Sequence, residues 1–89
     1  MFINKAPGDL NNISGKNIRR KRQILGISQR QLADMLQISG LDINKNAIQR
    51  IECGKRFVTD IEIVAIANVL QLSYNDILKT NLDFKNYEP

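Results

Sequence analysis

Residues 28–56 constrain the fold most, because they hold two short segments with the apolar spacing of amphipathic helices. A glycine follows each segment, Gly40 after the first and Gly54 after the second, and glycine readily ends a helix. Their inward-facing stripes are Leu32, Ala33 and Leu36 in the first segment and Ala47, Ile48 and Ile51 in the second. The sequence therefore predicts two helices, capped by Ser28 and Asn44, with an extended link over residues 41–43 between them.

Three further helices are predicted around this pair. The first is capped by Ser14 and ends near Leu25, where Ile18 and Leu25 share an inward face. The fourth begins at a Thr59–Glu62 capping box and runs to about residue 70, and the fifth covers about residues 73–79. The expected fold class is all-α, a compact five-helix bundle.

The 89 residues suffice for one domain, which we place at residues 14–79. Pro7 and Gly8 break regular structure, so residues 1–13 are expected to form a flexible arm. Residues 80–89 form a tail in which Leu82, Phe84 and Tyr87 stand among polar residues. This tail is either disordered or part of a contact with a partner.

Composition excludes several classes of protein. The chain has no histidine and a single cysteine, Cys53, which rules out a histidine-based catalytic triad, zinc-finger ligands and a disulfide framework. No phosphate-binding loop or paired carboxylates are evident, so we expect no enzyme, cofactor or metal. With no signal peptide and no apolar run approaching the roughly 20 residues of a membrane span, we expect a cytoplasmic protein.

Positive charge gathers in the first two thirds of the chain. Residues 1–56 carry eleven Lys and Arg against four acids, whereas residues 57–89 carry two against five. Such an asymmetry is typical of nucleic-acid binders, although basic surfaces are also common without one.

Helical geometry predicts one buried ion pair. Arg22 lies between Ile18 and Leu25 on the first helix and therefore partly faces inward. Glu52 falls at the edge of the buried stripe of the third helix. A buried guanidinium needs a partner, and Glu52 is the natural one.

The opposite face of the third helix is polar and carries Lys45, Asn46, Gln49 and Arg50. Arg and Lys suit the O6 and N7 atoms of guanine, while Asn and Gln suit the N6 and N7 atoms of adenine. A solvent-exposed helix face would have a similar composition, so the chemistry alone leaves both interpretations open.

Two linked motifs identify a family resemblance. Ser28-Gln29-x-x-Leu32-Ala33 opens one helix, and Ile48-x-x-Ile51-Glu52-x-Gly54-Lys55 closes the next. Together they resemble the Cro/repressor helix-turn-helix family, which includes the lambda and 434 phage repressors. The resemblance implies a lambda-repressor-like bundle that binds double-stranded DNA with its third helix in the major groove. This chain departs from the family in its longer connection between Leu36 and Asn44.

The resemblance also assigns roles to individual residues. It implies base reading by Gln29, Lys45, Asn46 and Arg50, with Gln49 as a weaker candidate, and a structural pair of Arg22 with Glu52. The residues expected to contact DNA phosphates are Lys16, Arg19, Arg20, Ser28, Arg30, Lys55 and Arg56. The cations at residues 55–56 would also be favoured simply by the dipole of the helix that precedes them.

The expected function is therefore transcription regulation, most simply repression by occupancy of an operator on the nucleoid. The two-fold operators of the family imply a homodimer. The alternative is an antitoxin or another protein-interaction module that binds a partner protein as well as DNA.

Overall fold

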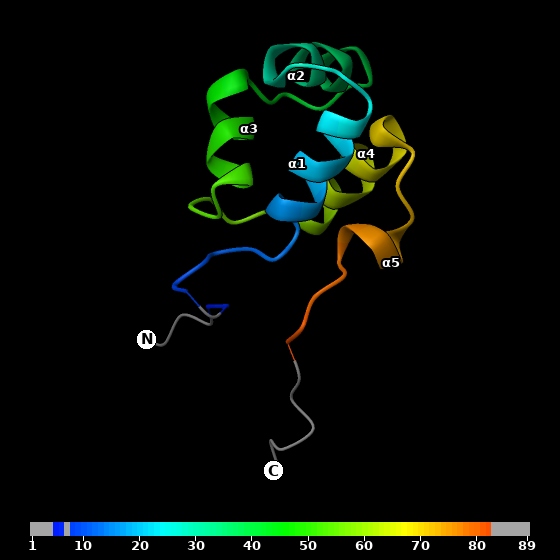
Figure 1. The fold of residues 1–89 in the computed structure, drawn as a ribbon. Coiled ribbons are helices and arrows are strands. Elements are labelled where there is room, and N and C mark those ends of the chain that lie inside the picture. Colours follow the sequence, from blue (N-terminus) through cyan, green and yellow to red (C-terminus); the bar gives the residue numbers. More distant parts are fainter. Residues whose placement is uncertain (1–4, 7, 83–89) are drawn as a thin grey trace.

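The computed structural model describes residues 5–6 and 8–82, and this part of the chain contains five helices and one isolated β-bridge, between Ala6 and Leu10. The helices are α1 (Gly15–Ile24), α2 (Gln29–Ile38), α3 (Lys45–Glu52), α4 (Asp60–Leu70) and α5 (Tyr74–Ile77). In Figure 1, α1 lies at the centre of the bundle and packs against α3, α4 and α5, while α2 packs against α3 and α4. The predicted all-α, five-helix architecture is confirmed. No helix among the described residues is long and apolar enough to cross a membrane.

The predicted capping boxes are both present. Ser28 Oγ accepts a hydrogen bond from the Gln31 amide at 3.0 Å, and Gln31 Oε1 accepts one from the Ser28 amide at 2.7 Å. Thr59 and Glu62 exchange the equivalent bonds at 3.2 and 2.9 Å. These bonds satisfy amides that a helix leaves unpaired at its amino end, and they fix where α2 and α4 begin.

The core is aliphatic and draws on every helix. Its buried members are Ile18, Leu32, Ala33, Leu36, Ile43, Ile48, Ile51, Ile66, Ala67, Leu70 and Ile77. The expectation that Leu25 shares the inward face of Ile18 is wrong. Because α1 ends at Ile24, Leu25 lies in its C-cap with 43% of the residue exposed, and Ile27 packs against the core instead.

The long connection between α2 and α3 is anchored at both ends. The Leu41 amide donates to the Leu36 carbonyl at 2.9 Å, and Gln37 Nε2 donates to the Ile43 carbonyl at 2.8 Å. Ile43 itself is buried in the core. Asn44 then caps α3 by accepting from the Ala47 amide at 2.8 Å. Although the connection is long, the buried Ile43 and the Asn44 cap therefore fix where α3 begins and which of its faces is buried.

The segment before α1 is attached to the bundle, although the sequence predicted a flexible arm over residues 1–13. The Asn11 amide donates to the Gly54 carbonyl at 2.7 Å, and Asn12 Nδ2 donates to the Ile51 and Arg56 carbonyls at 3.0 and 2.7 Å. Asn12 Oδ1 also accepts from the Gly15 amide at 2.8 Å, where Ser14 was the expected cap. Residues 1–4 and 7 of the predicted arm lie outside the described residues.

Gly15 lies where α1 meets the backbone of α3. A Cβ at this position would be 2.1 Å from the Ile51 carbonyl oxygen. Alanine normally favours a helix over glycine by roughly 0.5–1 kcal/mol, but here the two backbones would have to separate.

We therefore expect Gly15→Ala to lower the free energy of unfolding by about 1–3 kcal/mol, the usual cost of overpacking. Urea denaturation followed by circular dichroism measures it, with the exposed α1 substitution Gln23→Ala as a control that changes little. A Gly15→Ala protein as stable as the wild type would show that the close approach is absent.

Candidate nucleic-acid interface

The polar face of α3 points outward, as the periodicity predicted. Lys45, Asn46, Gln49 and Arg50 are all exposed, whereas Ile48 and Ile51 are fully buried against the core. The only acid on α3 is Glu52, which is itself buried. The helix thus presents hydrogen-bonding groups and cations to the outside with no carboxylate among them.

The predicted Arg22–Glu52 pair is present and has two hydrogen bonds. Arg22 Nε donates to Glu52 Oε2 at 2.7 Å, and the Arg22 terminal nitrogen Nη2 donates to Glu52 Oε1 at 3.0 Å. The side chains are 12% and 3% exposed, respectively. The hydrogen bond to Glu52 raises the pKa of Arg22, against the opposing effect of burial. The pair joins the last turn of α1 to the last residue of α3.

Two more bonds extend this pair into a network. Gln29 Nε2 donates to Glu52 Oε1 at 3.1 Å, and Arg22 Nη1 donates to the Ile27 carbonyl at 2.9 Å. The first residue of α2 and the turn before it are therefore held to the same two charged groups. This network fixes the amino end of α2 relative to α3, and a binding site built from two helices requires such a fixed geometry.

Arg56 has a structural partner, Glu62, that was not predicted from the sequence. Its Nη1 and Nη2 donate to Glu62 Oε1 and Oε2 at 3.0 and 2.8 Å, and Nη1 also donates to the Phe57 carbonyl at 3.1 Å. The hydrogen bond from Arg56 lowers the pKa of Glu62, while the same bond raises the pKa of Arg56. Glu62 thus serves both the capping box of α4 and the loop before it. The sign of this pair in the sequence was that Arg56 and Glu62 lie three residues before and after the capping residue Thr59.

The other predicted phosphate contacts divide by position. Arg19, Arg30 and Lys55 are exposed, and Ser28 is exposed while its hydroxyl caps α2. Lys16 and Arg20 are exposed too, but Arg20 lies two residues, or about 200° of helix rotation, from Arg22. Lys16 and Arg20 therefore lie on the side of α1 opposite Arg22. They line a groove with Lys79, which follows α5.

Two asparagines with structural roles were also missed. Asn12 holds the segment before α1 to the loop after α3. Asn17 Nδ2 donates to the Ile77 and Lys79 carbonyls at 2.9 and 3.0 Å and so holds the end of α5 against α1. Nothing in their local sequence distinguishes them from solvent-exposed asparagines. Among the described residues, no group of three or more histidine, cysteine or acidic side chains is placed to hold a metal ion.

A family model described as helix-turn-helix matches residues 18–77, about two thirds of the chain. The chain belongs to the helix-turn-helix family. It is of the Cro/repressor type, a DNA-binding regulator of transcription. No curated protein matched the chain.

Solved structures share the fold. The P22 c2 repressor, in complex with a synthetic operator, is 26% identical with a TM-score of 0.64, covering 76% of this chain and 96% of its own. The restriction-modification controller protein C.AhdI from Aeromonas hydrophila is 23% identical with a TM-score of 0.63, covering 72% and 86%. A hypothetical transcription factor from Neisseria, NHTF, is 18% identical with a TM-score of 0.68, covering 90% and 92%. The latter two likenesses concern the fold alone.

Replacing Glu52 tests the ion pair that orients α3. In Glu52→Ala the buried Arg22 guanidinium loses its carboxylate, so we expect the free energy of unfolding to fall by about 3–5 kcal/mol. Thermal and urea denaturation measure it, with Asp34→Ala on the exposed face of α2 as the matched acidic control. A Glu52→Ala protein that melts with the control would contradict a structural role for the pair.

Proposed function

We propose that α3 enters the major groove of double-stranded DNA and reads an operator, and that the protein represses transcription on the nucleoid by occupying this site. The observation that carries the proposal is the outward, acid-free face of α3, Lys45, Asn46, Gln49 and Arg50, on a helix held by Glu52. A major groove is wide enough to admit such a helix, and its base edges present the donors and acceptors that these side chains match.

Each side chain of this face has a preferred base. Arg50 suits a bidentate contact to guanine, and Asn46 and Gln49 suit adenine. Gln29 donates one amide hydrogen to Glu52, which leaves its second N–H and its carbonyl oxygen to contact a base or a phosphate. Lys45, at the first position of α3, has the reach for guanine or for a neighbouring phosphate.

The phosphate contacts that we propose are those of Ser28, Arg19, Arg30 and Lys55, which flank the reading face along the chain. Arg56 is left out because Glu62 already binds both of its terminal nitrogens. Lys16 and Arg20 are left out because they lie on the side of α1 opposite Arg22, where they line a groove with Lys79. The likeness to the P22 c2 repressor, whose structure contains a synthetic operator, supports this mode of binding.

Selection of bound sequences from a random duplex pool tests the reading face. We expect Arg50→Ala to relax the preference at one base position, at a cost of about 1–3 kcal/mol there. Lys55→Ala should weaken binding to all sequences alike and reduce the slope of log K against log salt by about 0.9. Failure of the wild type to enrich any sequence at low salt would refute base reading.

We further propose that the protein binds its operator as a homodimer through the outer side of α4. This helix is apolar almost all round: Ile63, Ile66, Ala67 and Leu70 face the bundle, while Ile61 and Val64 face outward. A helix that is apolar on all sides requires cover on all sides. Phe57, just before α4, extends the exposed patch.

The place of this patch in the chain favours a second copy of the protein. The patch follows α3 directly, so a two-fold axis there relates two reading helices, as a palindromic operator requires.

Ile61→Lys tests the dimer, because a lysine in the centre of an isologous apolar contact is present twice and is buried without a partner. We expect sedimentation velocity to show a dimer that Ile61→Lys converts to monomer. The control is Ile24→Lys on α1, since Ile24 is as exposed as Ile61, at 71% and 72%. A wild type that stays monomeric at high concentration, or an Ile61→Lys protein that stays dimeric, would contradict this interface.

A further inference from the structure

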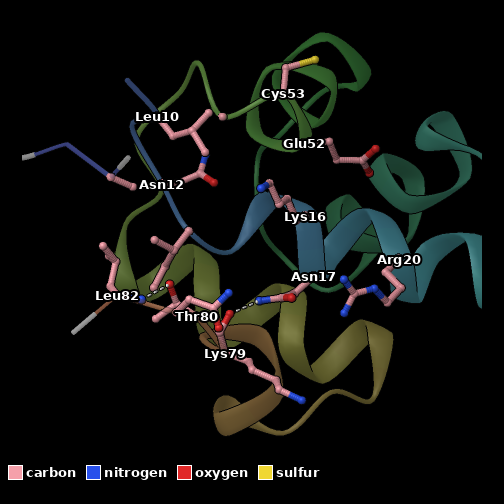
Figure 2. A pocket seen from close by; sticks show the side chains of 14 residues that line it. Leu10, Asn12, Lys16, Asn17, Arg20, Glu52, Cys53, Lys79, Thr80 and Leu82 are labelled. Carbon is pink, nitrogen blue, oxygen red and sulfur yellow. Dashed lines mark hydrogen bonds between the residues drawn. The ribbon is translucent and has the colours of Figure 1, made fainter. Parts of the chain in front are cut away.

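A groove of about 520 Å³ lies on the side of α1 opposite Arg22, where the end of α3 and the loop after it also border it, and the proposed DNA reading does not use it. Figure 2 shows side chains that line it: Leu10 and Asn12 from the segment before α1, Lys16 and Arg20 from α1, Glu52 and Cys53 at the end of α3, and Thr80 and Leu82 from the segment after α5. The groove therefore lies between the two chain segments that flank the helical bundle.

Both walls are held in place by side-chain hydrogen bonds. Asn11 Nδ2 donates to the Lys55 carbonyl at 2.9 Å and Asn12 Nδ2 to the Arg56 carbonyl at 2.7 Å, which fixes the wall before α1. Asn17 Nδ2 donates to the Ile77 and Lys79 carbonyls and fixes the opposite wall. Leu10 is also seated against Gly54, where a Cβ would meet its methyl group at 2.5 Å. The groove is thus preformed, which reduces the ordering cost of binding.

The charge around the groove is positive. Lys16, Arg20 and Lys79 line it, and none belongs to the ion pairs found among the described residues, which involve Lys5, Arg22 and Arg56. Glu52 also lines the groove, but it is buried and bonded to Arg22. Asp76 lines an adjoining hollow with Arg20 and Lys79, again outside those ion pairs. Among the described residues, three cations therefore face one exposed acid.

The floor of the groove is aliphatic. Leu10, Ile13 and Leu82 line it and are each only partly buried, so apolar surface remains accessible between the cations. A phosphodiester backbone would satisfy the cations but not this floor. A short aliphatic side chain flanked by carboxylates would satisfy both the cations and the aliphatic floor.

We propose that this groove binds an acidic peptide segment of a partner protein, with a leucine-like side chain on the floor and flanking carboxylates on Lys16, Arg20 and Lys79. The proposal does not depend on DNA reading by α3. It gives a physical site for the protein partner that an antitoxin-type function would require. Because its charge contacts are exposed, binding weakens as salt rises.

Fluorescence anisotropy with three labelled peptides tests the groove in the full chain. The first is acetyl-Gly-Asp-Glu-Leu-Leu-Glu-Asp-Gly, the second carries Asn and Gln in place of the acids, and the third carries Ser in place of both leucines. We expect saturable binding of the first peptide, and affinities lower by at least about tenfold for the other two. No saturable binding of the first peptide, or equal binding of the second, would overturn the proposal.

Two charge variants separate this site from the DNA interface. The triple substitution Lys16→Gln, Arg20→Gln and Lys79→Gln should weaken the acidic peptide by about tenfold. The double substitution Lys45→Gln and Arg50→Gln should weaken duplex DNA and leave the peptide unaffected. If the triple variant loses duplex DNA as strongly as the double variant and keeps the peptide, the groove cations serve DNA and the proposal is wrong.

The apolar floor needs its own variant. Leu82 lies after α5 and outside the buried core, so we expect the Leu82→Ser protein to keep the melting temperature of the wild type. It should weaken the leucine peptide and leave the already weak serine peptide unchanged. A Leu82→Ser protein that binds the leucine peptide as the wild type does would remove the floor from the proposed site.

Discussion

The Arg22–Glu52 pair determines how the exposed polar face of α3 is presented. Its two hydrogen bonds, at 2.7 and 3.0 Å, connect the central helix of the bundle to the last residue of α3. Buried ion pairs are weak evidence for stability, because desolvation offsets most of their attraction, but removing one partner is costly. Gln29 and the Ile27 carbonyl complete the hydrogen bonding of the pair. The same four groups therefore fix α1, the start of α2 and the end of α3 together.

Apolar packing and a close backbone contact hold α3 in place together with the ion pair. Ile48 and Ile51 seat α3 on the core, and Ile43 holds the connection that precedes it. Gly15 lets α1 approach the Ile51 carbonyl closely. With α3 held on one side by apolar contacts and on another by backbone and charge, its opposite face is left to solvent and to a ligand. A protein that reads DNA needs such a rigid presentation, because bidentate base contacts tolerate little displacement.

Much of this could be predicted from the sequence, since apolar periodicity and capping motifs are local signals. The five helices, the caps at Ser28, Asn44 and Thr59, and the outward face of α3 follow from spacing alone. The Arg22–Glu52 pair could also be predicted, because two inward-facing opposite charges on a small bundle have few other partners. Contacts between segments distant in sequence could not: Asn12, Asn17 and the groove between the two flanking segments depend on tertiary placement. The prediction that Leu25 faces inward was wrong for a related reason, because periodicity does not show at which residue a helix ends.

The attachment of the segment before α1 has a consequence for the order of folding. The carbonyl groups that Asn11 and Asn12 bind belong to residues 51 and 54–56, about forty positions later in the chain. Contacts of such sequence separation form only after the intervening chain has closed into a loop. During synthesis, α1 and α2 can therefore form before this segment has anything to bind. Its docking requires α3 and the loop after α3 to be in place, so this segment is among the last parts of the bundle to reach its final position.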